Sequence, residues 1–246
     1  MKRLTFLSQM HKILLVVLCF LILGNNANSQ STEYKKNTEI GLLGGAAYYL
    51  GDLNTTHFSQ SSPCAGLVIR KNFDRRFSYK AEALFLSLRS DERVSTDIIS
   101  LDRGLHFKSL VYELSGQIEF NFLPYELGNP LYKWSPFLYT GVSIFNFNPQ
   151  AENKNGQWVD LQPLGTEGQG TSAFQDRTVY SLVQFAIPLG GGIKIAINEF
   201  FNIIVECGVR KTFTDYLDDV SMSYPGKNIG ALHEYPIEMN QAAIEM

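Results

Sequence analysis

The chain has 246 residues, of which 45% are hydrophobic and 13% aromatic, and its formal net charge is −3. An acidic chain lacks the basic surface that nucleic acids require, which argues against a nucleic-acid partner. Beyond residue 29 no apolar run approaches about 18 residues, so the sequence predicts no transmembrane helix.

Residues 1–29 have the pattern of a secretory signal peptide. Three basic residues accompany the start of the chain, the apolar core Ile13–Leu23 follows, and small residues stand at Ala27 and Ser29. The core is shorter than the ~20 residues that span a bilayer, which disfavours a single membrane anchor. We therefore predict an exported protein that is cleaved before Gln30.

A short polar lead, residues 30–37, precedes a region of strand patterns that extends from 38 to 224. The first strand is predicted over Thr38–Gly51, where several glycines favour the tight curvature of a small barrel. A short second strand follows at Ala65–Lys71. The third, Phe77–Leu88, places aromatic and small residues on one face and Lys80 and Glu82 on the other.

The clearest alternation extends from Phe107 to Phe122. A soluble sandwich also alternates, but its strands have about 5 to 6 residues, whereas a tilted strand across a bilayer needs roughly 9 to 11. The length therefore favours a membrane strand. One face carries Leu110, Tyr112, Leu114, Ile118, Phe120 and Phe122, and the opposite face carries Ser109, Glu113, Ser115, Gln117, Glu119 and Asn121.

Three more strands are predicted after residue 135, at Pro136–Phe147, Thr178–Ile197 and Phe200–Thr212. In the first of these it is ambiguous which residues share the apolar face, whereas the other two alternate clearly between apolar and polar residues. Residues 90–105 and 148–176 have no apolar periodicity and are predicted to be loops. Long and short connections alternate along the chain, as in outer-membrane barrels with short turns on one side and long loops on the other.

These patterns predict an all-β fold, a small antiparallel outer-membrane β-barrel of the eight-stranded type with long loops on one rim. Only seven strands are recognisable, although single-chain bacterial barrels usually have an even number. The tail 225–246 has no strand pattern. Truncation before a closing strand is the favoured explanation, and an edge left open or covered by a partner is the alternative.

Charged side chains gather on the polar faces of the predicted strands. A barrel of about eight strands has room inside for side chains and little else, which favours an ion-pair network over the lining of a pore. The predicted interior residues are Lys80, Glu82, Glu113, Glu119, Lys194, Glu206 and Arg210.

A second group of polar residues falls in three loop segments that alternating strand directions place at the long-loop rim. Carboxylates and amides suit a hard cation such as calcium, but Asp and Asn more often form hydrogen bonds with loop backbone, and we favour that interpretation. No metal or other cofactor is therefore predicted. The rim residues are Asp52, Asn54, Glu167, Asp215, Asp218 and Asp219.

No catalytic constellation is evident in the sequence. The histidines that follow the signal peptide are isolated, and no serine, histidine and acid have the spacing of a known motif. A lipid hydrolase that uses His106 and Ser109 near one rim is the enzymatic alternative.

Four segments resemble the PorG-like family of outer-membrane proteins, which belong to the type IX secretion machinery of Bacteroidota. They are YYLGDLN at Tyr48–Asn54, ELSGQIEFNF at Glu113–Phe122, WVDLQPLGTEGQG at Trp158–Gly170, and TDYLDDVSMSY at Thr214–Tyr224. The resemblance implies an eight-stranded barrel that anchors a periplasmic ring, built of a lipoprotein and a partner subunit, to the outer membrane. In that family the pattern continues into a final aromatic strand, which is not recognisable here.

From the resemblance we expect a non-enzymatic component of protein secretion, and of gliding motility in some members, located in the bacterial cell outer membrane. Its expected partners are outer-membrane lipid and the ring subunits. Two alternatives remain open, a small transport or adhesin barrel unrelated to secretion and a barrel enzyme that acts on lipid.

Overall fold

The computed structural model describes residues 34, 36–94, 101, 104–153, 155–169 and 177–220. The predicted signal peptide 1–29 and the tail 225–246 lie outside the described residues, as does most of the lead 30–37. None of the helices in the described ranges is long and apolar enough to cross a membrane.

The regular secondary structure of the described part of the chain is almost entirely β-strand. Two 3-10 helices, η1 (Glu92–Val94) and η2 (Gln162–Leu164), lie in the long loops. The strands are β1 (Asn37–Ala47), β2 (Ser62–Asn72), β3 (Phe77–Asp91), β4 (His106–Asn121), β5 (Trp134–Glu152), β6 (Trp158–Asp160), β7 (Val183–Ala196) and β8 (Asn202–Thr212).

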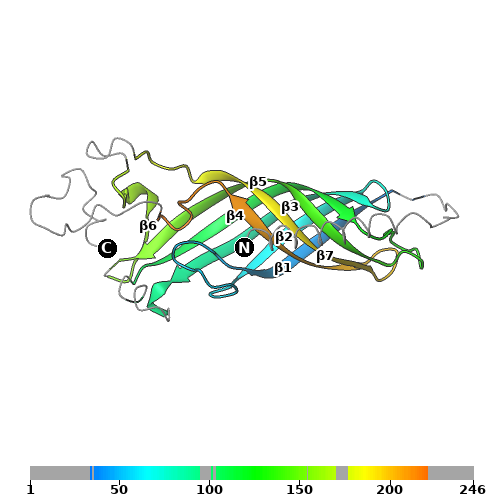
Figure 1. Ribbon diagram of the computed structural model, residues 1–246, viewed down its shortest axis with the longest axis horizontal. Coiled ribbons are helices and arrows are strands. Elements are labelled where there is room, and N and C mark those ends of the chain that lie inside the picture. Colours follow the sequence, from blue (N-terminus) through cyan, green and yellow to red (C-terminus); the bar gives the residue numbers. More distant parts are fainter. Residues whose placement is uncertain are drawn as a thin grey trace, which may run out of the picture. The chain divides into compact units, whose positions relative to one another are not determined.

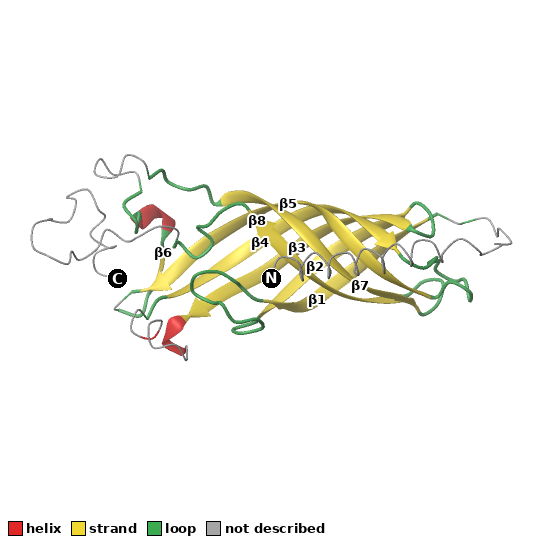
Figure 2. Ribbon diagram, in the orientation of Figure 1, coloured by secondary structure: helices red, strands yellow, loops and turns green. Residues whose placement is uncertain are grey.

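All strand pairs are antiparallel, and the hydrogen-bonded order is β1-β2-β3-β4-β5-β7-β8, with β6 paired to β5 beyond this path. The strands lie side by side and are tilted relative to the long axis of the sheet (Figures 1 and 2). Their turns at one end, such as 73–76 and 197–201, are short. The connections 48–61, 92–105 and 153–182 at the other end are long, and they carry β6 and both 3-10 helices. The predicted all-β, antiparallel, barrel-like fold is therefore confirmed.

The sheet is curved, and its two faces have opposite chemistry. On β4, Leu114 and Ile118 on the convex face are 60% and 61% exposed, whereas Gln117 and Glu119 on the concave face are 1% and 0% exposed. This alternation continues along the whole strand. The apolar side of the sheet therefore faces outward and the polar side is buried, the reverse of a water-soluble sandwich.

Curvature brings the two end strands of the path together at the short-turn end. Asn202 of β8 donates a hydrogen bond to Glu39 of β1 over 2.7 Å. No backbone ladder joins β1 to β8 among the described residues. Both strands run in the same direction, because an odd number of antiparallel strands separates the two edges. Concave-face side chains on β8 are less covered than those in the middle of the sheet: Arg210 is 29% exposed and Lys80 1%.

Close backbone approach requires glycine in the middle of the sheet. A Cβ on Gly141 of β5 would lie 2.1 Å from the carbonyl oxygen of Gly116, and one on Gly192 of β7 would lie 2.1 Å from that of Val205. In β1, by contrast, a Cβ on Gly41 or Gly44 would meet nothing within 4 Å. The tightest packing therefore lies in the β4–β5–β7–β8 part of the sheet rather than in the glycine-rich first strand.

Several predicted boundaries were wrong. The predicted loop 148–176 contains the end of β5, the short strand β6 and η2, because residues 148–152 continue the β5 alternation and β6 pairs with the last three of them. The predicted loop 90–105 begins with the last two residues of β3 and η1. The first strand ends at Ala47, and β7 begins at Val183 rather than at residue 178.

Candidate functional site

Two ion-pair clusters fill the concave face. In the first, at the short-turn end, Glu119 of β4 accepts from Arg70 of β2 over 2.7 Å and from Lys194 of β7 over 2.5 Å. Arg70 also lies 3.3 Å from Glu39 of β1. The side chains of Glu119 and Lys194 are 0% exposed. Four strands therefore meet through two cations and two anions that neutralise one another.

The second cluster lies nearer the long-loop end. Lys80 of β3 pairs with Glu82 over 3.0 Å and with Glu206 of β8 over 2.9 Å. Arg210 of β8 pairs with Glu82 over 3.2 Å and with Glu113 of β4 over 3.0 Å. Because β8 supplies Glu206 and Arg210 while β3 and β4 supply the rest, these pairs cross the interior and hold β8 over the middle of the sheet.

Aromatic rings occupy the space between the charges. The ammonium of Lys80 lies 4.4 Å from the centroid of the Tyr139 ring, and that of Lys194 lies 4.8 Å from the Phe137 ring. Tyr125 is 2% exposed and accepts a hydrogen bond from Asn202. Buried cations over aromatic faces gain attraction that they would lose in water. Charge pairs and aromatic rings therefore lie together on the buried concave face of the described strands.

All seven residues proposed from the sequence for the interior, Lys80, Glu82, Glu113, Glu119, Lys194, Glu206 and Arg210, lie on the concave face and take part in these clusters. Sequence reasoning missed Arg70 and Glu39. The period-two spacing of Arg70 and Asn72 was the available signal, but the predicted second strand ended at Lys71 and so excluded Asn72.

A third group, the rim cluster (Tyr49, Thr166, Tyr180, Asp218 and Asp219), joins the long loops. The Tyr49 hydroxyl donates to Asp218 over 2.5 Å, and the Tyr180 hydroxyl donates to Asp219 over 2.5 Å. The Thr166 hydroxyl also donates to Asp219. The three segments that stood out in the sequence, around Tyr49, Thr166 and Asp218, are therefore joined by buried hydrogen bonds between residues far apart in the chain.

Aromatic packing supports the rim cluster from below. The Tyr180 ring stacks on Tyr216 with centroids 4.6 Å apart and on Phe147 at 6.2 Å. Tyr49 meets Phe107 edge to face at 5.1 Å. These rings belong to the apolar core at the long-loop end, so the rim cluster closes that end of the sheet over a hydrophobic layer.

The other rim residues divide into two groups. Asn54 is buried and donates to the Tyr49 carbonyl over 2.8 Å, and Glu167 is 0% exposed. Asp52 and Asp215 are exposed, whereas Glu167, Asp218 and Asp219 are buried, so the five carboxylates do not share one environment. Within the described ranges no group of His, Cys, Asp or Glu side chains has an arrangement that could hold a metal ion. The contacts are those of carboxylates and amides that order loops.

Burial changes the acidity of the rim carboxyls. Removal from water raises the pKa of Asp218 and of Asp219 to about 6, although hydrogen bonds from Tyr49, Tyr180 and Thr166 oppose the rise. Burial also raises the pKa of both tyrosines, which therefore remain protonated donors. Near neutral pH the rim holds ionised carboxylates in a poorly hydrated place, and at mildly acidic pH they become neutral.

The pair His106 and Ser109 has no catalytic geometry. His106 lies on the convex face, where its Nε2 accepts from the Glu152 amide and its ring meets Trp158. Ser109 lies on the concave face, and its hydroxyl accepts from the Asn148 amide. Three residues of separation in a strand place side chains on opposite faces, so the two cannot act on one substrate.

The segment 122–133 forms an ordered surface at the short-turn end. The Arg75 side chain pairs with Glu126 over 2.8 Å and lies 4.6 Å from the centroid of the Tyr132 ring. The Arg75 carbonyl oxygen accepts a hydrogen bond from the Tyr125 amide. Gly128 has a φ of 77° and approaches Glu199 so closely that a Cβ would lie 2.9 Å from the Glu199 Cβ. The segment is thus held against the neighbouring turns.

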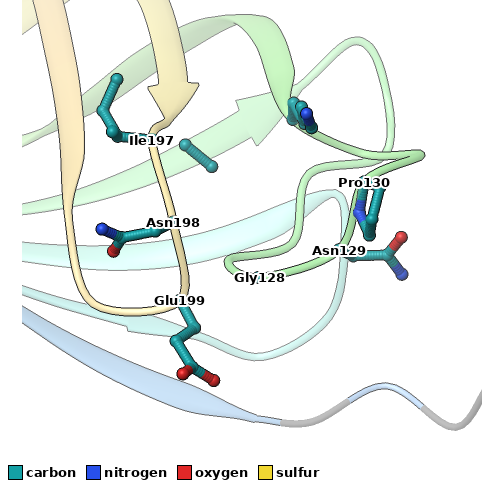
Figure 3. A pocket seen from close by; sticks show the side chains of 8 residues that line it. Gly128, Asn129, Pro130, Ile197, Asn198 and Glu199 are labelled. Atoms are coloured by element: carbon teal, nitrogen blue, oxygen red, sulfur yellow. The ribbon is translucent and has the colours of Figure 1, made fainter.

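A pocket lies where this segment meets the β7–β8 turn (Figure 3). Gly128, Asn129 and Pro130 face Asn198 and Glu199 across it. The lining residues are Gly128, Asn129, Pro130, Lys133, Ala196, Ile197, Asn198 and Glu199. Two exposed side chains of opposite charge, Lys133 and Glu199, belong to this lining.

Residues 11–163 match the family model described as "Domain of unknown function (DUF6089)", and the chain belongs to this family. No curated protein matches the sequence. No solved structure matches it either.

The Glu119 pairs predict a large stability effect. Glu119→Gln leaves Lys194 buried without a counter-charge and leaves Arg70 with Glu39 as its remaining partner, which we expect to lower the free energy of unfolding by about 3–5 kcal/mol. Urea unfolding in detergent micelles, followed by tryptophan fluorescence, measures this. Glu199→Gln, which removes an exposed turn carboxylate, is the control and should change stability little. Equal unfolding curves for the two variants would contradict the role given to Glu119.

The rim cluster predicts pH-dependent loop order. Because the folded pKa of Asp218 and Asp219, about 6, is above the ordinary value of 3.8, their contribution to stability is full below 3.8 and is lost as the pH rises through 6. Amides of residues 161–169 and 213–220 should therefore exchange more slowly at about pH 5 than near neutrality, after correction for intrinsic rates. Hydrogen–deuterium exchange measures this.

The double variant Asp218→Asn, Asp219→Asn mimics the neutral carboxyls and should lose the pH effect. Asp215→Asn, an exposed neighbour, should keep it. If the wild type and the double variant have the same pH dependence, these carboxyls are not its source.

Proposed function

We propose that this member of the DUF6089 family is a non-enzymatic β-barrel of the bacterial outer membrane that serves the type IX protein secretion and gliding machinery. In this proposal it anchors the periplasmic ring complex, built of a lipoprotein and a partner subunit, to the membrane. The observation that carries the membrane part is the continuous exposed apolar face of the sheet. The secretion part rests on the sequence resemblance described above.

The convex face has the composition and height of a lipid-facing surface. Residues that are 46–88% exposed recur on every principal strand: Ile40, Leu42, Leu67, Phe85, Leu114, Ile118, Val142, Phe185 and Val205. On β4 the apolar stretch from Leu110 to Phe122, at about 3.3 Å per residue and a tilt of about 45°, would cover about 28 Å of bilayer. A water-soluble protein rarely exposes so large an apolar surface.

The interior supports an anchor rather than a channel. Salt-bridged side chains that are almost completely buried, such as Lys80, Glu82, Glu119 and Lys194, lie where a porin has water. Such charges are costly to separate, because each is compensated only by its partners. A protein of this kind offers the membrane a rigid, filled support and offers partners its two ends.

The short-turn end fits the side that faces the periplasm, because outer-membrane barrels place their short turns there. The ordered segment 122–133 and the pocket beside Glu199 lie at this end. Leu131 and Phe200, 82% and 79% exposed, add apolar surface next to them. This end is therefore the proposed contact surface for the ring, while the long-loop end closes on itself through the rim cluster.

Two alternatives come from other classes. A small transport or adhesin barrel shares the membrane placement, and solute flux into liposomes that hold the purified protein would favour it over the anchor. A lipid-modifying enzyme needs a catalytic set, and the opposite faces of His106 and Ser109 remove the pair that motivated it.

Membrane placement predicts the accessibility of β4. In a variant without Cys64 and Cys207, a lipid-soluble maleimide should label Leu114→Cys and Ile118→Cys in membranes, and a water-soluble maleimide should not. Ser115→Cys, buried on the concave face, should react with neither reagent. Rapid labelling of Leu114→Cys by the water-soluble reagent would contradict the membrane assignment.

The anchor role predicts a specific complex. After gentle solubilisation, an affinity-tagged chain should co-purify with the periplasmic ring lipoprotein and its partner subunit. Leu131→Ser combined with Phe200→Ser should reduce this recovery several-fold, because it removes apolar surface at the proposed contact. Phe58→Ser, an equally exposed aromatic change in the long loop 48–61, is the matched control. Absence of both ring subunits from the wild-type preparation would count against the proposed function.

A further inference from the structure

Two cations lie side by side where the apolar part of the convex face ends. Arg89 of β3 and Lys108 of β4 are direct cross-strand partners. The preceding pair on the same face is Ser87 and Leu110, and Tyr112 follows. Leu110 and Tyr112 are 49% and 56% exposed. Arg89 and Lys108 are therefore the first pair on the convex face after the apolar residues, on the side of the long loops.

No ion pair within the described chain neutralises these two cations. Neither Arg89 nor Lys108 has an ion pair there, and like charges opposite one another destabilise a sheet. The neighbouring carboxylates are already engaged. Asp91 pairs with Arg93 over 2.8 Å, and Asp160 accepts from Asn148 and Gln150 over 2.9 and 2.6 Å. An anion from outside the chain would relieve the repulsion.

Aromatic side chains fix the position of the lysine. The Lys108 ammonium lies 3.7 Å from the centroid of the Trp158 ring, and Trp158 belongs to β6, beside the end of β5 (Figure 1). The His106 ring meets the same indole edge to face at 6.0 Å. Tryptophan with basic residues above an apolar belt is the composition of the headgroup level of a membrane protein.

We propose that Arg89, Lys108 and Trp158 form a binding site for the phosphate-bearing headgroup of a membrane lipid. The inference rests on the proposed membrane placement and adds the ligand and its position. The guanidinium of Arg89 offers paired donors that match phosphate geometry, and Lys108 adds a point charge held by the indole. The acyl chains would lie on Leu110, Tyr112 and Phe85, directly below the cations. An inorganic phosphate would gain only the polar half of this site.

The test uses the purified full chain in nonionic detergent with lipid A, a diphosphorylated lipid, as the probe, and native mass spectrometry measures the bound lipid. The wild type should retain lipid A, and Arg89→Gln combined with Lys108→Gln should weaken its binding roughly tenfold. Lys71→Gln combined with Lys211→Gln removes the same charge from exposed positions elsewhere on the sheet and should leave binding unchanged. Inorganic phosphate in large excess should not displace the lipid.

Equal loss in both double variants would show general charge attraction and overturn the site, as would unchanged binding in the Arg89 and Lys108 variant. Displacement by inorganic phosphate would overturn the lipid assignment. Urea unfolding of each variant establishes that it folds. The maleimide experiment on Leu114→Cys is independent of this one: failed insertion counts against the proposed function, whereas intact insertion without lipid A binding counts against the headgroup site alone.

Discussion

The fold depends on the mutual neutralisation of charges that are buried together. Glu119 is the centre of this arrangement, because it accepts from Arg70 of β2 and from Lys194 of β7 while its own strand lies between them. A charge in so dry a place is tolerated only with its partners present. The sheet must therefore curve until β2, β4 and β7 bring these side chains into contact. Curvature is thus required by electrostatics as well as by strand twist.

The polarity of the sheet follows from this arrangement. Because the concave face holds these charges, the apolar residues that alternate with them, such as Leu114 and Ile118 on β4, lie on the convex face, where the period of two places them. Exposed leucines and valines would be a liability in water, but they are the suitable surface for a protein whose solvent is lipid. The loops at the long-loop end complete the enclosure, because the rim cluster covers the aromatic layer beneath it.

The sequence predicts such a structure where each strand has one apolar and one polar face. This holds for β4, β7 and β8, whose interior charges could be named from alternation alone. It fails for β5, where Phe137, Tyr139 and Phe145 lie inside while Leu138 and Ile144 lie outside, so that no hydrophobic contrast marks the two faces.

The contacts within the rim cluster could not be predicted from the sequence pattern either. Tyr49 and Asp218 are 169 positions apart, and only the antiparallel topology brings them to the same end. Alternating strand directions place the segments at one rim, but they do not specify which tyrosine meets which carboxylate. That choice depends on side-chain packing against Phe107 and Phe147, which has no period in the sequence.

The pairing of β8 with the interior has a consequence for how the chain reaches its final form. Neighbouring strands can join as hairpins soon after they are made, but Lys80 and Glu206 are 126 positions apart, and Glu82 and Arg210 are 128 apart. Until β8 arrives, Lys80 and Glu82 of β3 lack half of their compensation and have to keep their water. Contacts across so long a span close slowly, because the entropy of the intervening chain is lost before any contact is gained. Dehydration of the interior and the docking of β8 are therefore one event, and a chain stopped before β8 would retain a wet, open sheet.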